Sequence, residues 1–132
     1  MASIFTKIVN GEIPAYKVAE TSDFLAFLDA FPSVKGHVLV IPKQEVDYLF
    51  DLEDGYYLRL QHFAKKVAAG VKKAIPCQRV GVMVLGMEVP HAHIHLVPMQ
   101  AEADLLNFAT KIKLEPAEMQ QIAGRIAAEI EL

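Results

Sequence analysis

Three histidines at alternate positions are the side chains of this sequence best suited to chemistry. His91, His93 and His95 lie in residues 90–98 and are separated by single apolar residues. Successive side chains of an extended strand point to opposite faces, so the three imidazoles should share one face. The segment therefore predicts a strand with one chemical face and one core face.

The spacing of these histidines limits what they can bind together. At about 3.3 Å per residue, neighbouring imidazoles are roughly 6.6 Å apart and the outer two roughly 13 Å apart. A zinc–nitrogen bond of about 2.1 Å lets one ion take an adjacent pair, but all three only with difficulty. The spacing favours a line of separate imidazoles. Two other interpretations stay open: a polar strand face turned to water, and a metal site made by one pair with a third ligand from elsewhere.

Residues 91–97, with the pattern His-x-His-x-His-x-x, resemble the signature of the histidine triad (HIT) family. Residues 4–14, 24–29 and 36–43 are similar to family segments in the same order, so the resemblance covers roughly residues 4–98. It implies an α+β fold in which a five-stranded antiparallel sheet packs against helices. It also implies a nucleotide-binding hydrolase that forms a homodimer.

Hydrophobic periodicity independently predicts a compatible order of elements. We expect a short N-terminal helix, three strands, one long amphipathic helix, an antiparallel pair of strands and a C-terminal helix. Their expected positions are residues 4–10, 16–20, 24–28, 37–41, 53–75, 80–85, 90–98 and from Pro116 onward. The chain is thus predicted to be a single histidine triad domain over residues 1–132, with residues 99–132 as a C-terminal tail and helix.

Composition excludes several classes of function. A formal net charge of −3 argues against binding to a nucleic-acid backbone, which requires a basic surface. Cys77 is the only cysteine, so no internal disulfide can form, and we expect a cytoplasmic protein. The longest apolar stretch, around residues 80–89, is much shorter than the roughly 20 residues that span a bilayer, so no membrane association is expected.

The resemblance assigns catalytic roles to four histidines. His93 would attack phosphorus and form a nucleotidyl-imidazole intermediate that water then cleaves, in a cycle that needs no metal and no cofactor. His91 and His95 would flank the reacting phosphate, and His37 on an adjacent strand would complete the cluster. His37 could instead be a surface histidine at the start of a strand. His62, on the polar face of the long helix, is expected to be a surface residue.

The resemblance also implies a site for the nucleoside. Asp29 matches a carboxylate that accepts hydrogen bonds from the ribose hydroxyls, although it could simply initiate a turn before Phe31 and Pro32. Four apolar residues match positions that form a slot for a purine, and the residues alone favour a plain core role for them. These four are Ile4, Phe5, Ile8 and Phe27.

The sequence departs from the family pattern at two places. Many members carry a Cys-x-x-Cys pair that belongs to a structural zinc site, whereas Ser3 and Thr6 stand here, so that site should be absent. Glu88 stands where a neutral donor would assist the leaving group, and an ionised carboxylate can only accept hydrogen bonds. Backbone N–H groups near Glu88 and Val89 could still serve the phosphate. Glu88 could also recognise an amine-bearing leaving group, as a phosphoramidate supplies.

Three functions follow, in order of preference. The first is a hydrolase acting at the α-phosphate of a purine nucleotide conjugate: a phosphoramidate, an aminoacyl-adenylate or a dinucleoside polyphosphate. The second is a regulatory module that binds a nucleoside monophosphate with little activity, and the third is a metal-dependent hydrolase that uses a histidine pair. We expect a homodimer that makes contact through the long helix and residues 80–85.

Overall fold

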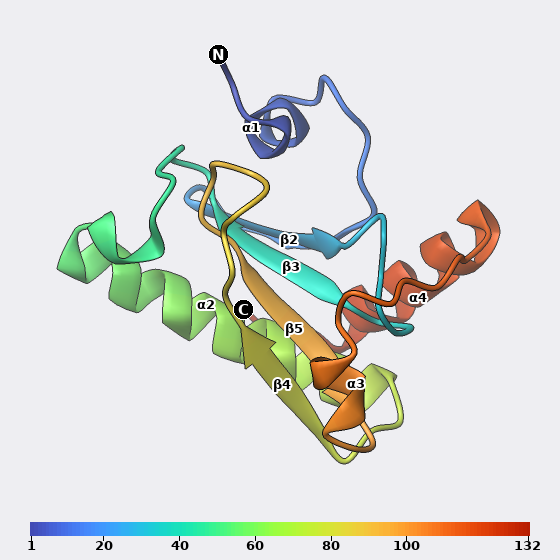
Figure 1. Ribbon diagram of the computed structural model, residues 1–132. Coiled ribbons are helices and arrows are strands. Elements are labelled where there is room, and N and C mark those ends of the chain that lie inside the picture. The colour runs from blue at the N-terminus through green and yellow to red at the C-terminus, as the bar shows by residue number, and fades with distance from the viewer.

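The computed structural model describes residues 1–132, and its centre is a five-stranded antiparallel sheet with the strand order β1-β2-β3-β5-β4 (Figure 1). The strands are β1 (Lys17–Glu20), β2 (Phe24–Leu28), β3 (Val38–Pro42), β4 (Arg79–Met83) and β5 (Ile94–Met99). The helices are α1 (Ile4–Val9), α2 (Asp54–Ala74), α3 (Ala103–Leu106) and α4 (Pro116–Glu129), with a 3-10 turn at Leu49–Asp51. The predicted α+β fold, with its short first helix, long helix and C-terminal helix, is confirmed.

One face of the sheet carries the main hydrophobic core. Alternate residues of the central strands, such as Ala26, Val40 and Ile94, pack there against α2 and α4. The helices contribute buried apolar side chains at helical spacing, among them Val67 and Ile126. This core holds the three central strands at fixed positions, so the side chains on their other faces are fixed as well.

The opposite face of the sheet carries a smaller cluster beneath α1, which lies over one end of the sheet in Figure 1. The buried residues of this cluster are Phe5, Ile8, Leu25, Phe27, Leu39 and Ile41. Side chains alternate along a strand, so His37 and His95 point to the same face as Leu39 and Ile41. The histidine-rich site therefore lies on the α1 side of the sheet, away from the long helix.

The helix boundaries follow from local capping. Ser3 caps α1 by accepting a hydrogen bond from the Thr6 N–H, and Gly11 leaves the helix with a φ of 79°. Glu53 caps α2 by accepting from the N–H groups of Gly55 and Tyr56. The same capping residue at α1, Ser3, also contacts the histidine cluster, which connects helix formation to the site.

The strand that carries the histidines begins later than predicted, at Ile94 rather than near residue 90. Pro42 explains this difference, because the register that pairs Val40 with Ile94 would next place Pro42 opposite Ala92, and proline has no N–H for the ladder. The Ala92 N–H instead donates to the Val46 carbonyl, 2.7 Å away. His91 and His93 therefore precede β5, and only His95 lies on it.

The structure adds two smaller corrections to the expected elements. β4 ends at Met83, two residues before the predicted end, and residues 84–93 form a longer link than a tight hairpin would need. Helix α3 was not predicted, because its four residues are too few to show helical periodicity. None of the helices combines the length and the apolar character needed to cross a membrane.

Candidate active site

Four histidines converge on the α1 side of the sheet, flanked by two phenylalanines. The ring centres form a row: Phe5 is 5.0 Å from His93, His93 is 5.0 Å from His95, and His95 is 4.8 Å from Phe108. His37 lies beside this row, with its ring centre 5.2 Å from that of His95. The expected cluster of imidazoles is therefore present, although only part of it lies on a strand.

His93 has one ring nitrogen held by the backbone and one without a partner. Its Nδ1 lies 2.7 Å from the carbonyl oxygen of His91, and a carbonyl can only accept, so Nδ1 carries the proton and donates. In the neutral ring Nε2 then keeps its lone pair. Every buried side-chain nitrogen and oxygen has a hydrogen-bond partner. Because Nε2 of His93 makes no hydrogen bond within the protein, it must be open to solvent.

His37 and His95 form a chain of hydrogen bonds with a fixed direction. The Ser33 N–H donates to Nδ1 of His37 at 3.1 Å, so the proton of a neutral His37 is on Nε2. That Nε2–H donates to Nδ1 of His95 at 3.0 Å. The proton of His95 is then on its own Nε2, which has no partner within the protein and so is open to solvent as well. The chain presents a neutral N–H donor beside His93.

Burial keeps the imidazoles of His37 and His95 uncharged at ordinary pH. Desolvation lowers the pKa of His37 to about 4, and the positive charge of Lys111 acts in the same direction. Desolvation, followed by the charges of His37, His93 and Lys111, lowers the pKa of His95 to about 3. Both rings are therefore neutral near pH 7, which is the state that the hydrogen bonds require.

His91 is fully buried and uses both ring nitrogens within the protein. Its Nε2–H donates to the Pro42 carbonyl at 2.7 Å, and its Nδ1 accepts from the Ser3 hydroxyl at 2.8 Å. Desolvation lowers the pKa of His91, which agrees with a neutral ring. His91 thus fixes the backbone carbonyl that holds His93, and in this arrangement it has no free nitrogen to offer a ligand.

Ser3 and Thr6 belong to a hydrogen-bond network around His91. The Glu45 carboxylate accepts from the Ser3 N–H and from the Thr6 hydroxyl, both at 2.6 Å. These hydrogen bonds lower the pKa of Glu45 to about 2. The network connects α1 to Glu45 and to His91, and the role of Glu45 was not predicted from the sequence.

The expected nucleoside residues lie around the same face. Phe5, Ile8 and Phe27 are buried in the cluster under α1, whereas the side chain of Ile4 is 49% exposed. The three buried residues are thus part of a core, and their role as a purine slot stays a prediction. So does that of Val89, which packs against the same cluster.

Asp29 lies next to the histidine chain. One carboxylate oxygen accepts from the Phe31 N–H at 2.9 Å, and the other is 3.6 Å from Nε2 of His37. Burial raises the pKa of Asp29, and the negative charge of the exposed Glu88 acts in the same direction. The hydrogen bond to Phe31 is the turn contact expected for Asp29, and the second oxygen is left for another donor.

Comparison with known proteins decides the family. The model of the HIT domain matches residues 10–102. The chain belongs to the HIT family.

This HIT protein is similar to curated relatives over most or almost all of its length. It is 35% identical to the adenosine 5'-monophosphoramidase hnt1 of Schizosaccharomyces pombe over 98% of this chain and 99% of that protein. It is 37% identical to the adenosine 5'-monophosphoramidase HNT1 of Saccharomyces cerevisiae over 76% of this chain and 65% of that protein. The crystal structure of a Hit-like protein involved in cell-cycle regulation from Bartonella henselae matches with a TM-score of 0.85 at 29% identity, covering 97% of this chain and 96% of that one.

Sequence reasoning missed one side of this HIT protein's site. Phe108 packs its ring edge-on against His95 and His37, and the Lys111 ammonium lies 3.6 Å from the centre of the Phe108 ring. Both residues lie beyond the matched domain, in a stretch without regular periodicity. No local pattern reveals them, because their position depends on contacts with strands far away in the sequence.

Proposed function

We propose that this HIT protein is a hydrolase that cleaves purine nucleotide conjugates at the α-phosphate, as a nucleoside phosphoramidase. The observation that supports this most is the state of His93: a proton held on Nδ1 by the His91 carbonyl, and an Nε2 lone pair open to solvent. An imidazole in this state is a nucleophile ready to attack phosphorus without first losing a proton. The names of the two fungal relatives support phosphoramidates as the substrate class.

The proposed reaction has two steps: transfer of the nucleotidyl group to His93, and its hydrolysis. Nε2 of His93 forms a bond to the α-phosphorus while the bond to the leaving group breaks, and the leaving group takes the electron pair and a proton from solvent. Water then attacks the same phosphorus and gives a proton back to solvent, the phosphorus–nitrogen bond breaks with its electron pair returning to Nε2, and a nucleoside monophosphate leaves. The net reaction consumes one water and releases the leaving group in its protonated form.

The other histidines support the charge that develops. Nε2–H of His95, aligned through His37 and the Ser33 N–H, is a neutral donor for a phosphate oxygen. A donor that is already oriented needs no reorganisation during the reaction. In this proposal His91 acts through His93 rather than on the phosphate, because both of its ring nitrogens bind protein groups.

The substrate would lie across the face under α1. We propose the free oxygen of Asp29 for a ribose hydroxyl and the apolar residues near Phe5 and Phe27 for the purine. Glu88, exposed in the middle of the link between β4 and β5, would lie toward the leaving group. A carboxylate there favours an amine over a second phosphate.

A metal-dependent hydrolase is the second candidate, because Asp29, His37 and His95 have ligand atoms within 4.8 Å of one another. The hydrogen bonds disfavour it. Both Nε2 of His37 and Nδ1 of His95 would need free lone pairs, so the proton of His37 would move to Nδ1. Nδ1 would then face the Ser33 N–H, placing two donors against each other. The observed chain of donors favours direct catalysis by imidazole.

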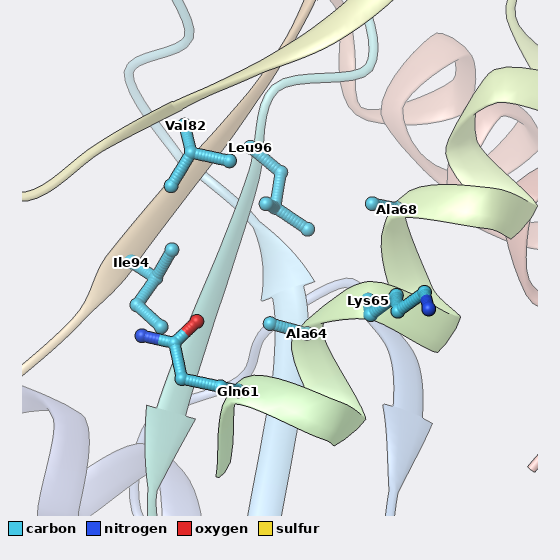
Figure 2. Close-up of a pocket in the computed structure, with 7 residues that line it drawn as sticks. All are labelled: Gln61, Ala64, Lys65, Ala68, Val82, Ile94 and Leu96. Carbon is cyan, nitrogen blue, oxygen red and sulfur yellow. The ribbon is translucent and has the colours of Figure 1, made fainter. Parts of the chain in front are cut away.

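We also propose that two copies associate through β4 and α2. β4 is an edge strand, and its Val82 is 58% exposed. Figure 2 shows an apolar groove in which Val82 and Leu96 of the sheet face Ala64 and Ala68 of α2. An edge strand has unpaired backbone N–H and C=O groups that can bind a strand of another chain. Two copies of β4 can pair in this way, antiparallel, about a two-fold axis.

Turnover of an adenosine phosphoramidate by the intact protein tests the proposed function. We expect release of AMP that His93→Ala abolishes and that a chelator leaves unchanged. The matched control is His62→Ala, which removes an exposed histidine of α2 and should retain full activity. Activity that a chelator abolishes and zinc restores would support the metal-dependent alternative. Absence of turnover by the wild-type protein would contradict both.

A further inference from the structure

Residues 100–113 reach the site although most of them lie beyond the part of the chain that matches the HIT domain. The match ends at residue 102. The Ile112 N–H donates to the Pro32 carbonyl at 2.9 Å, which fastens this segment to the loop before β3. The next residue of that loop, Ser33, orients His37. Residues 100–113 are thus attached next to Ser33, where the hydrogen-bonded row of Ser33, His37 and His95 begins.

Phe108 and Lys111 extend the row of rings by one aromatic group and one cation. The Phe108 ring is 4.8 Å from that of His95 and 5.6 Å from that of His37. The Lys111 ammonium lies over Phe108 at 3.6 Å, within the distance for a cation–π contact. Because the Phe108 ring contacts both the Lys111 ammonium and the His95 ring, the ammonium also lies near His95. A lysine side chain is long and flexible enough to turn from the ring toward a ligand at His95.

The positive charge of Lys111 is the feature of this segment that bears on ligand binding. With His37 and His95 neutral, the hydrogen-bonded chain brings donors but no fixed positive charge, while Asp29 and Glu88 are carboxyl groups. Lys111 is the only lysine or arginine whose charge contributes to the pKa shifts of Asp29, His37 and His95. A nucleoside monophosphate carries close to two negative charges near pH 7. A cation favours its binding, and among the lysines and arginines only Lys111, beyond the matched residues 10–102, acts on these three groups.

We propose that Lys111, held in place by the Phe108 ring, binds the phosphate of the nucleotide and makes the site prefer ligands with greater negative charge. This inference rests on the proposed function for the identity of the ligand. Phosphate would draw the ammonium away from Phe108 and toward Nε2 of His95. The interaction is stronger for AMP and for dinucleoside polyphosphates than for a singly charged phosphoramidate, so Lys111 balances the opposite preference of Glu88.

Affinity for AMP, measured by calorimetry on the intact chain, tests Lys111 without requiring catalysis. Lys111→Met keeps an unbranched side chain over Phe108 but removes the charge, and we expect AMP binding to weaken about tenfold at low salt. Lys111→Arg should retain wild-type affinity. The matched control is Lys113→Met, which removes an exposed lysine of the same segment and should leave binding unchanged.

Ionic strength separates a charge effect from a structural one. Lys111 is exposed, so its contribution should shrink as salt rises from about 20 mM to about 500 mM and screening shortens the range of the interaction. A loss that persists unchanged at high salt, equal losses in Lys111→Met and Lys113→Met, or unchanged binding in Lys111→Met would each overturn the inference. Phosphoramidate turnover is read separately, so an inactive protein that still binds AMP through Lys111 would contradict the proposed function alone.

Discussion

Neutral, buried histidines should make the stability of this protein fall steeply as pH drops from about 7 to about 5. His37 and His95 bind protons in the folded state only near their pKa values of about 4 and about 3, whereas in the unfolded chain each has an ordinary pKa of 6.5. Below pH 6.5 the unfolded state therefore binds more protons than the folded state, and protonation favours unfolding. The stabilisation is complete above that pH and is lost progressively below it.

The magnitude follows from the two shifts. Each neutral buried histidine contributes a slope that approaches about 1.4 kcal/mol per pH unit, so the pair lowers the free energy of unfolding by about 4 kcal/mol between about pH 7 and about pH 5. That is a large part of the roughly 5–15 kcal/mol by which domains are stable. The pKa values of the Glu20, Glu45 and Glu53 carboxyls are lowered from 4.5. These groups therefore change the free energy of unfolding only at pH values below those at which the histidines act.

Urea unfolding at several pH values measures this slope. His37→Asn leaves an acceptor for the Ser33 N–H but cannot titrate, so we expect about half of the pair's pH dependence to disappear. The raised pKa of Asp29 acts in the opposite direction but is common to both proteins. His62→Asn, at an exposed position of α2, should leave the slope unchanged. If the free energy of unfolding of the wild type did not change with pH, or if His37→Asn left its pH dependence unchanged, His37 and His95 would not be the neutral buried pair described above.

Three further substitutions test separate parts of the structure. Glu88→Gln should reduce the preference for phosphoramidates over dinucleoside polyphosphates, measured as a ratio of kcat/KM values, and an unchanged ratio would exclude Glu88 from leaving-group recognition. Glu45→Ala removes the acceptor for Ser3 and Thr6; we expect a lower melting temperature and slower turnover, and a protein unaltered in both would show that this network is dispensable. Val82→Glu places a charge on the exposed edge of β4, so sedimentation should detect monomers in place of dimers; equal sedimentation of the variant and the wild type would contradict the proposed interface.

Much of the fold could be predicted because its signals are local. The β-branched run that became β3 and the apolar stripe of α2 each specify an element within their own residues. The alternation of residues 91–97 correctly separated the histidines from apolar partners that entered the core. What failed was the start of β5, because that depends on Pro42 of a neighbouring strand, which a local pattern does not reveal.

The candidate site shows the same division between local and distant information. The histidines were found because their spacing is regular, and their roles came from the family resemblance. The hydrogen bonds that set the protonation of His37 and His91 come from Ser33, Pro42 and Ser3, which lie far from residues 91–97 in the sequence or carry no chemical signal of their own. Phe108 and Lys111 were missed for the same reason, since only the folded chain brings them to His95.

The covalent intermediate on His93 tests the central claim most directly. The protein would be mixed with an adenosine phosphoramidate, quenched within a single turnover, and digested for mass spectrometry. We predict an adenylyl group on His93 in the peptide that contains residues 91–97, and none in His93→Ala. Turnover without any adduct, or an adduct on another residue while His93→Ala remains active, would contradict the assignment of His93 as the nucleophile.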